Sequence, residues 1–410
     1  MQLHFQFCIF ARYYSKAHVD NNKLKIGLFN ESFPPIQDGV AQVVENYAKL
    51  LSERGHDVTV ATAKVPFFDY PVTYHVKNIV SVPLIFRLPY RVGLPVWMAP
   101  FQPILNFKAE IYHLHSPFTS GRIALKLGKK FNAPVVATFH SKYRDDFLRS
   151  VKSDRVADLM VKRIVGVFEE ADEVWVPQEG VKEVLRSYGY RGPIEVVSNA
   201  IDYDLSDLDL PMLRKQARQM LDVDGDTPCF LFVGQIIKEK RVDFILDALT
   251  TLHEKGYRFK MFYVGTGYWV EELKLKIRLR HLRDCVIYKG QISDRSALQL
   301  YYAAADLFLF PSLYDTFGLV IREAAVHRTP SLMMRQALCA KGIKEDVSGF
   351  LVDDTSPEAF ALKIIEIMDN KTLYNSVCDH AEEDLGLTWK KLMPEVEDRY
   401  RSLIKRKQSK

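Results

Sequence analysis

The sequence predicts a protein of the α/β class with two domains, each built on a parallel β-sheet. Its 410 residues exceed what one hydrophobic core usually holds. Short apolar runs alternate with amphipathic helical patterns along almost the whole chain, which is typical of βαβ units with parallel strands. The alternation restarts after Asn199, so we expect the two domains to join near residues 198–210.

The same pattern divides the chain into four segments. Residues 1–23 form an N-terminal extension that lacks the basic start and the cleavage site of a signal peptide. Residues 24–198 form the first domain and residues 199–385 the second. Residues 386–410 are charged and helical in pattern, and we expect a C-terminal helical segment there.

In the first domain, apolar runs predict strands at 25–29, 57–61, 111–115, 135–139, 174–177 and 194–198. A helix is expected at 41–54, because Val44, Tyr47 and Leu51 recur at helical spacing and Gly55 ends the pattern. In the second domain the predicted strands are 229–233, 259–264, 286–288, 307–310 and 331–334. Helices are expected between them at 242–252, 269–279, 297–304 and 319–326.

A further helix start is marked by Ser356, Pro357 and Glu358, which supply a cap, a first-turn proline and an acid beside the helix dipole. Ligands of open α/β sheets bind beyond the carboxyl ends of the strands. With two such domains facing each other, we expect the functional site in a cleft between them.

Composition narrows the classes of function. The chain has 56 basic and 51 acidic residues, a net charge of +5, which suits an anionic ligand but is too weak to indicate nucleic-acid binding. Five cysteines without C-x-x-C spacing argue against a disulfide framework or a zinc site and favour a reducing compartment. We therefore expect a cytoplasmic protein. Its positive charge and the segment 86–97 allow peripheral contact with an anionic membrane on the inner face.

The most informative motif is FPSLYDTFGLVIREAA at 310–325, where an apolar strand ends at a loop containing Asp315. The backbone amides of Phe317, Gly318 and Leu319 open the next helix and suit a diphosphate. Carboxylates such as Asp315 and Glu323 suit sugar or ribose hydroxyls, because they accept two hydrogen bonds. One ligand, a nucleotide diphosphate sugar, satisfies both. A capped helix with one buried, paired glutamate is the structural alternative.

A second motif, VGQIIKEKR at 233–241, concentrates Lys238, Lys240 and Arg241 after a buried strand, where a diphosphate can bind. A solvated charged turn explains it equally well. Asp38-Gly39 opens the first helix and lets backbone amides approach an anion, but a plain loop has the same composition. The turn VGTG at 264–267 is a weak signal by itself.

Two histidines follow buried strands of the first domain. His140 lies just past a strand end, where catalytic residues gather in such sheets, and His115 has a similar placing. Either of them can instead be a structural histidine whose hydrogen bonds are satisfied. The sequence names His140 as the candidate and leaves His115 as its rival.

Taken in chain order, these motifs resemble those of the retaining glycosyltransferases of family four, over residues 25–369. The motifs that carry the resemblance are Asp38-Gly39, FVGQIIKEKR, YVGTG and FPSLYDTFGLVIREAA. The resemblance implies the GT-B fold, in which two Rossmann-like domains face each other across a cleft and C-terminal helices cross back to the first domain. It also implies a hexosyltransferase that moves a sugar from a UDP- or GDP-linked donor to a lipid or glycan acceptor with retention of configuration. FHSKYRDDF at 139–147 is similar to the acceptor side of members that glycosylate lipids.

The resemblance also assigns the site residues. Glu323 holds the donor ribose and Asp315 contacts the transferred sugar. Our own mechanistic hypothesis adds His140 near that sugar. Gly39, Gln235, Lys240 and the amides at 317–319 complete the donor site. Asp315 stands where the family usually has Glu, and Gln235 stands where it usually has Arg, so one phosphate-neutralising charge is missing. Because Lys240 and helix amides can neutralise the leaving group, we expect no metal and no other cofactor.

Other functions remain open from the sequence alone. A nucleotide-sugar epimerase or a phosphorylase has the same fold. A catalytically idle nucleotide-sugar-binding or scaffold protein is suggested by Gln235 and Asp315. A third alternative is a protein that acts first at the membrane surface.

Overall fold

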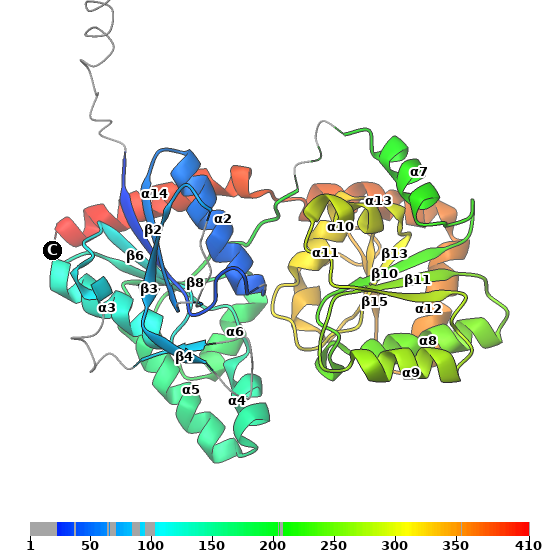
Figure 1. The fold of residues 1–410 in the computed structure, drawn as a ribbon, viewed down its shortest axis with the longest axis horizontal. Helices are drawn as coiled ribbons and strands as arrows, with labels where there is room; N and C mark the ends of the chain where they lie inside the picture. Colours follow the sequence, from blue (N-terminus) through cyan, green and yellow to red (C-terminus); the bar gives the residue numbers. More distant parts are fainter. Residues whose placement is uncertain are drawn as a thin grey trace, which may run out of the picture.

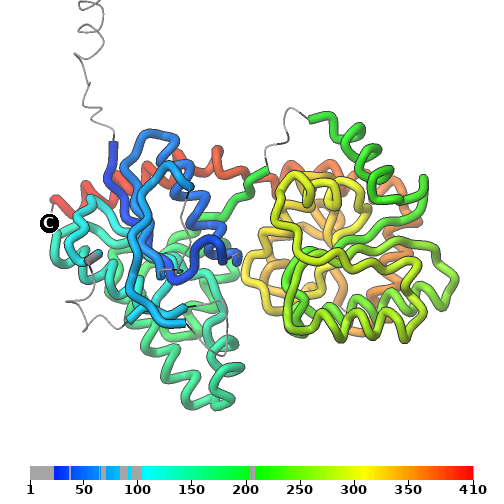
Figure 2. The backbone as a smooth tube through the Cα atoms, viewed as in Figure 1, coloured from blue at the N-terminus to red at the C-terminus, as the bar shows by residue number. Residues whose placement is uncertain are grey.

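The computed structural model describes residues 23–36, 38–63, 65, 71–83, 91–94, 103–203, 205, 208–353 and 355–409. These residues form two lobes joined by two crossings of the chain (Figures 1 and 2). The extension 1–22 lies outside the described residues, as does all of segment 86–97 except 91–94. In the described part, no helix is long and apolar enough to span a membrane.

The N-terminal domain contains a seven-stranded parallel sheet in the order β3-β2-β1-β6-β7-β8-β9. Its strands are β1 (Lys25–Phe29), β2 (Asp57–Ala63), β3 (His75–Ile79), β6 (Ile111–Leu114), β7 (Val135–Thr138), β8 (Glu173–Val176) and β9 (Ile194–Val196). The helices are α2 (Gly39–Glu53), α3 (Thr119–Phe131), α4 (Tyr143–Val151), α5 (Asp154–Glu169) and α6 (Glu179–Ser187). A short antiparallel pair, β4 (Ser81–Pro83) and β5 (Arg91–Gly93), and the 3-10 turn η3 (Pro103–Asn106) complete the described elements.

The C-terminal domain contains a six-stranded parallel sheet in the order β12-β11-β10-β13-β14-β15. Its strands are β10 (Cys229–Val233), β11 (Lys260–Val264), β12 (Val286–Gly290), β13 (Leu307–Phe310), β14 (Ser331–Met334) and β15 (Phe350–Val352). The helices are α7 (Leu210–Met220), α8 (Val242–Glu254), α9 (Val270–Leu279), α10 (Arg295–Ala304), α11 (Leu319–Val326), α12 (Pro357–Asp369) and α13 (Lys371–Leu385). Two 3-10 turns, η4 (Lys238–Lys240) and η5 (Leu338–Gly342), follow β10 and β14.

The last helix, α14 (Trp389–Gln408), returns to the N-terminal domain. It runs along the lobe that contains β1 and α2 (Figure 2). Trp389, Met393 and Tyr400 are buried there in one core with Leu28 and Val44. The predicted return of the C-terminus is therefore confirmed for α14, whereas α13 packs into the core of the C-terminal domain.

Most predicted strands end within two residues of the observed ends, but helix α2 begins two residues earlier than expected. Asp38 causes this shift, since its side chain accepts hydrogen bonds from the backbone N–H groups of Val40 and Ala41 at 3.0 and 2.8 Å. Strand β3 escaped prediction because it lies at the sheet edge, where His75, Lys77 and Asn78 are exposed.

In each sheet there is one point at which the strand order reverses direction, and such a point predicts a ligand site. In the C-terminal domain, β10 lies between β11 and β13, so the chain turns in opposite directions after β10 and after β13. Ligands of open α/β sheets bind at such switch points, beyond the strand ends. The motifs at 233–241 and 310–325 follow these two neighbouring strands, so the fold brings them together.

Candidate active site

The centre of the site is an ion pair between the two motifs. The ammonium group of Lys240, at the end of η4, pairs with the carboxylate of Asp315, which follows β13. Ser312 Oγ also donates to Asp315 Oδ2 at 2.6 Å. Both side chains are largely buried, with 12% and 18% of their surface exposed. The fold therefore brings together two residues that are 75 positions apart in the sequence.

Two aromatic rings flank the ammonium group of Lys240. Its Nζ atom lies 5.6 Å from the ring centre of Phe310 and 5.6 Å from that of Tyr314. Such cation–π contacts attract the ammonium group without neutralising it. Lys240 can therefore exchange Asp315 for a phosphate group without leaving its position.

The N-terminus of α11 presents the predicted amide groups. Gly318 has φ +70° and caps the helix, and a Cβ atom there would lie 2.4 Å from Ile321 Cδ1, so this position requires glycine. Among the described residues, none accepts a hydrogen bond from the amides of Phe317, Gly318 or Leu319. Backbone amides at a helix start are free to bind an anion, as a diphosphate site requires.

Arg322 was not predicted as part of the site, yet it fixes the same loop. Its guanidinium lies 3.6 Å from the ring centre of Phe317, and its Nη1 donates to the Phe317 carbonyl at 2.9 Å. Burial lowers the pKa of Arg322 to about 10. A charged residue between Ile321 and Glu323 looks like a surface position in the sequence, so no local signal indicates this contact.

Glu323 lies one turn into α11 and is buried. Its Oε1 accepts from Arg295 Nη1 at 2.9 Å and its Oε2 accepts from the Tyr302 hydroxyl at 2.8 Å. The guanidinium of Arg295 also lies 4.3 Å from the ring centre of Tyr203 in the segment that joins the domains. Each carboxylate oxygen keeps a second lone pair with which it can accept from a ribose hydroxyl.

Three buried histidines lie at the strand ends of the N-terminal domain. His140 Nε2 lies 3.0 Å from His115 Nδ1. His113 bonds to the Tyr400 hydroxyl at 2.6 Å and to Thr138 Oγ1 at 2.7 Å. Burial lowers the pKa of His140 to about 3, and it lowers the pKa of His113 and His115 well below the ordinary range. All three are therefore neutral at physiological pH.

His140 also touches the donor loop of the other domain. Its carbonyl accepts a hydrogen bond from Thr316 Oγ1 at 2.7 Å. Thr316 lies between Asp315 and Phe317, so the fold places His140 beside the predicted donor site. His115, the alternative candidate from the sequence, is hydrogen-bonded to His140 through the two rings, so the structure brings both histidines together.

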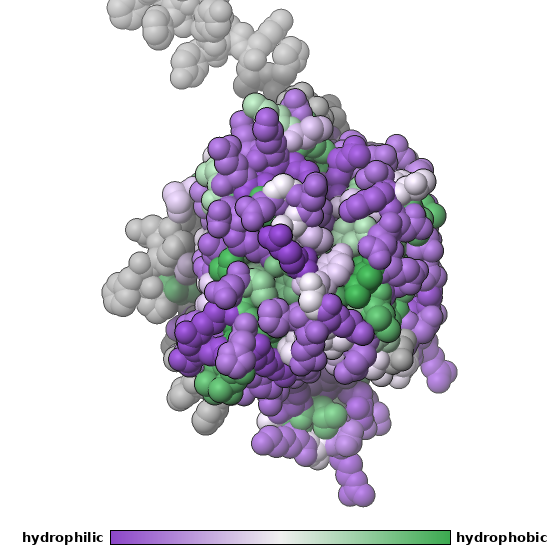
Figure 3. All heavy atoms as spheres, turned by 90° about the vertical axis from the view of Figure 1, so that its right-hand side faces the viewer, coloured by the Kyte–Doolittle hydropathy of each residue, from purple (hydrophilic) through white to green (hydrophobic). Residues whose placement is uncertain are grey.

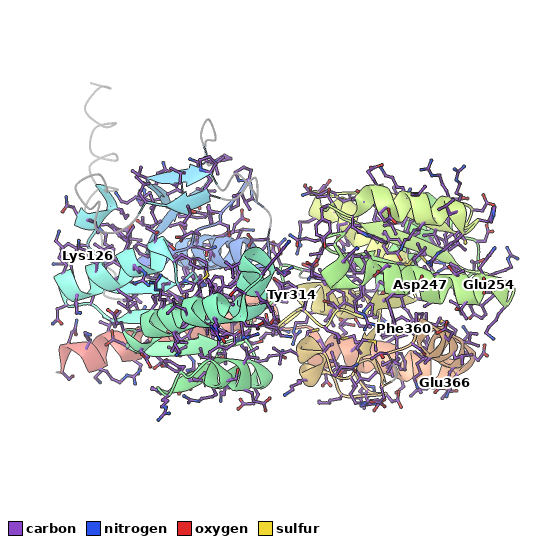
Figure 4. All side chains as sticks on the ribbon, turned by 90° about the horizontal axis from the view of Figure 1, so that it is seen from below. Lys126, Asp247, Glu254, Tyr314, Phe360 and Glu366 are labelled. Carbon is purple, nitrogen blue, oxygen red and sulfur yellow. The ribbon has the colours of Figure 1, made fainter. Side chains whose placement is uncertain are left out.

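A set of polar contacts fastens helix α4 to the same loop. Lys142 Nζ donates to the Leu313 carbonyl at 2.8 Å, and Arg149 Nη2 donates to the Tyr314 hydroxyl at 2.9 Å. That hydroxyl donates to Asp146 Oδ1 at 2.6 Å, and Arg149 Nη1 lies 2.9 Å from Glu239 Oε1. Tyr314 lies where the two lobes meet (Figure 4). The segment similar to an acceptor region, 139–147, thus contacts the donor loop directly.

Two of the predicted donor-site residues have no hydrogen bond or ion pair to this cluster in the described part of the chain. Gly39 and Gln235 are both exposed, and among the described residues no hydrogen bond or ion pair joins either of them to Lys240, Asp315 or Glu323. The amides that follow Gly39 are already capped by Asp38. Arg241 cannot replace the charge missing at 235 in this arrangement, since its guanidinium lies 4.0 Å from the ring centre of Phe244.

The VGTG turn supports the loop that carries Lys240. Gly234 N donates to the Val264 carbonyl at 3.0 Å, and Ile236 N donates to the Thr266 carbonyl at 2.9 Å. A Cβ atom on Gly267 would lie 2.3 Å from the Ile236 carbonyl oxygen. The glycines therefore allow two backbones to touch, which the sequence alone does not indicate.

We expect Gly267→Ala to lower the free energy of unfolding by about 1–3 kcal/mol, because the new methyl group forces these backbones apart. Donor affinity should fall as well, since the displaced loop leads to Lys240. Gly225→Ala is the matched control, because its Cβ would meet nothing within 4 Å. Urea unfolding of both variants measures the difference. Equal midpoints would contradict the close packing of the two loops.

Family models match both halves of the chain. The family described as Glycosyl transferases group 1 matches residues 214–384, and the one described as Glycosyltransferase Family 4 matches residues 37–205. The chain belongs to the family-four glycosyltransferases. The predicted enzyme class, a hexosyltransferase with the GT-B fold, is thereby confirmed.

This glycosyltransferase is similar to several named relatives. It is 25% identical to the alpha-monoglucosyldiacylglycerol synthase of Streptococcus pneumoniae over 312 residues, which are 75% of this chain and 70% of the relative. It is 24% identical to the GDP-mannose-dependent alpha-mannosyltransferase of Corynebacterium glutamicum, with 93% and 89% covered. The crystal structure of Anabaena HepE in complex with UDP and glucose superposes with a TM-score of 0.72 at 17% identity, covering 92% of this chain and 100% of HepE.

Proposed function

We propose that this glycosyltransferase moves a hexose from a UDP- or GDP-linked donor to a lipid or glycan acceptor, with retention of anomeric configuration. The observation that carries the proposal is the meeting of Lys240, Asp315, the start of α11 and Glu323 at one sheet edge, beside His140. Of the relatives named above, one is a GDP-mannose-dependent alpha-mannosyltransferase and another is an alpha-monoglucosyldiacylglycerol synthase, which supports a nucleotide-sugar donor and a lipid acceptor.

In the proposed mechanism, the donor diphosphate lies against Lys240 and the amides of residues 317–319. When the bond between the sugar and the phosphate breaks, these groups stabilise the negative charge on the leaving nucleoside diphosphate. Asp315 then accepts hydrogen bonds from hydroxyls of the transferred sugar, and Glu323 accepts from the ribose. The acceptor oxygen bonds to the same face of the sugar carbon, and its proton passes to the leaving phosphate.

Turnover tests this proposal directly. Purified protein is incubated with UDP- and GDP-linked glucose, mannose, galactose and N-acetylglucosamine, with diacylglycerol, glycolipid and glycan acceptors, and the released nucleoside diphosphate is measured. Release with one donor, dependent on one acceptor, supports the proposal, and NMR of the product then reads the anomeric configuration. An inverted product contradicts retention. Binding of a donor without any turnover favours the idle scaffold.

We also propose that the reaction needs no metal ion, because Lys240 and the amides of α11 already supply positive charge where the leaving group forms. The acids Asp202 and Asp204 are poor candidates for a metal site because they lie in the segment that joins the domains. Initial rates in metal-free buffer should be equal with and without EDTA. Loss of activity that Mg²⁺ or Mn²⁺ restores would contradict this part.

A lipid acceptor requires contact with a membrane, and helix α5 offers a suitable face. Val156 and Leu159 are 44% and 52% exposed, and Arg155, Lys162 and Arg163 are exposed beside them. Apolar and basic side chains on one helix face suit an anionic lipid surface. The outer end of the C-terminal domain, by contrast, is mostly hydrophilic with separate hydrophobic patches (Figure 3).

We expect Val156→Ser/Leu159→Ser to reduce flotation with liposomes that contain phosphatidylglycerol, while Leu279→Ser leaves it unchanged. Leu279 is the matched control because it is 68% exposed but belongs to the C-terminal domain. Binding should weaken with salt and with loss of the anionic lipid. Weak, salt-insensitive binding that neither change affects would contradict membrane contact through α5.

A further inference from the structure

The hydrogen bond between His115 and His140 connects a buried residue to the candidate active site. The two histidines follow the neighbouring strands β6 and β7, and their rings are inclined by only 20° with centroids 5.3 Å apart. Only 1% of His115 and 6% of His140 is exposed. Among the described residues, His115 has no hydrogen bond to the donor loop, and its hydrogen bond to His140 is its direct link to the candidate site.

One of the two nitrogens must donate in this bond, and the surroundings of His115 select which one. Both rings are neutral, because burial holds their pKa values below the ordinary range, so each carries one N–H. His115 Nε2 is buried and has no hydrogen-bond partner among the described residues. If His140 donated, His115 would carry its proton on Nε2 as a buried N–H without an acceptor.

A buried donor without a partner costs about 1–3 kcal/mol, and such N–H groups are rarer in proteins than acceptors without donors. The favoured arrangement therefore has the proton of His115 on Nδ1, where it donates to His140 Nε2. His140 then carries its own proton on Nδ1. Nδ1 of His140, the ring nitrogen outside this bond, is then a hydrogen-bond donor and cannot act as a base.

The ring of His115 is held in place from other sides. His113 lies against it with ring centroids 3.9 Å apart, and Tyr47 meets it edge-on at 5.4 Å. His113 is itself fixed by Tyr400 of α14 and by Thr138. The buried ring of His115 is therefore enclosed by His113, Tyr47 and His140, which restrict its rotation.

We infer that His115 is a positioning residue, which donates from Nδ1 to His140 Nε2 and so makes His140 a hydrogen-bond donor toward a hydroxyl of the transferred sugar. This role rests on the proposed sugar transfer, because His140 needs that hydroxyl as its partner. The contact between Thr316 and the His140 carbonyl places the backbone of His140 against the donor loop.

Two variants of His115 separate this role from a purely structural one. His115→Leu removes the donor and should lower kcat by about 10- to 100-fold with little change in donor KM. His115→Asn places an amide N–H near the former Nδ1 position and should recover most of that rate. If both variants are equally slow, or if both are as fast as the parent enzyme, the inference is wrong.

A spectroscopic measurement keeps the test independent of activity and of folding of the variants. Nitrogen-15 NMR of the unmodified protein reports which ring nitrogens carry protons. The inference requires His140 protonated on Nδ1 and His115 protonated on Nδ1. A His140 protonated on Nε2 would overturn it even if transfer is observed, whereas absence of any turnover with the predicted tautomers would count against the proposed function only.

Discussion

Replacement of Lys240 with alanine should lower kcat/KM for the donor by about 10²- to 10³-fold, the loss typical when one group that stabilises a leaving anion is removed. Lys240 is paired with Asp315, and two aromatic rings flank its ammonium group. With Gln235 exposed and Arg241 packed on Phe244, no second basic residue of this motif takes its place.

Lys238→Ala is the matched control, because Lys238 is an exposed lysine of the same turn. Its kcat/KM should stay within about threefold of the parent enzyme, as expected for a surface charge. Lys240→Ala also leaves Asp315 without its cation, so Lys240→Ala/Asp315→Asn should be compared as a double-mutant cycle. Unchanged kinetics of Lys240→Ala would remove this residue from the site.

Acidification from pH 7 to pH 4 should lower the free energy of unfolding by about 3 kcal/mol through His140 alone. In the folded protein burial lowers the pKa of His140 to about 3, whereas in the unfolded chain it is about 6.5. Between these values the unfolded chain binds a proton that the folded chain does not, so stability falls as the pH falls. Above pH 6.5 both states are neutral and the effect vanishes.

The comparison with His140→Gln isolates this contribution. Urea unfolding of both proteins at pH 7, 6, 5 and 4 gives two pH slopes, and carboxylates contribute equally to each. The parent slope should exceed that of the variant by about 1.4 kcal/mol per pH unit below pH 6. Equal slopes would mean that His140 is protonated in the folded state and is less buried than the structure indicates.

The predictions from the sequence were most accurate for elements whose side chains are buried on both faces. Strands β10, β13 and β14 and helix α11 match their predicted bounds residue for residue, because continuous apolar runs leave little choice of strand ends. Strand β15 was missed because its three residues, Phe350–Val352, form an apolar run too short to be told from a loop.

Parts of the site depend on tertiary contacts that local patterns do not contain. The pairing of Lys240 with Asp315 follows from β10 lying beside β13, which is a property of strand order. Arg149 contacts Tyr314 only because the two domains meet there. Its pair with Asp146, three residues earlier on α4, was a visible signal, but such pairs are usually surface features.

The measurement that tests the donor site most directly is thermal unfolding of the purified protein with UDP, GDP and their sugars, repeated with Lys240→Ala. A ligand at a hundred times its dissociation constant adds about 2.7 kcal/mol of stability, which raises the unfolding midpoint clearly. We predict a rise with one nucleotide and its sugar for the parent protein, and a much smaller rise for the variant. No rise with any of these ligands, or an equal rise in both proteins, would contradict a donor site built on Lys240.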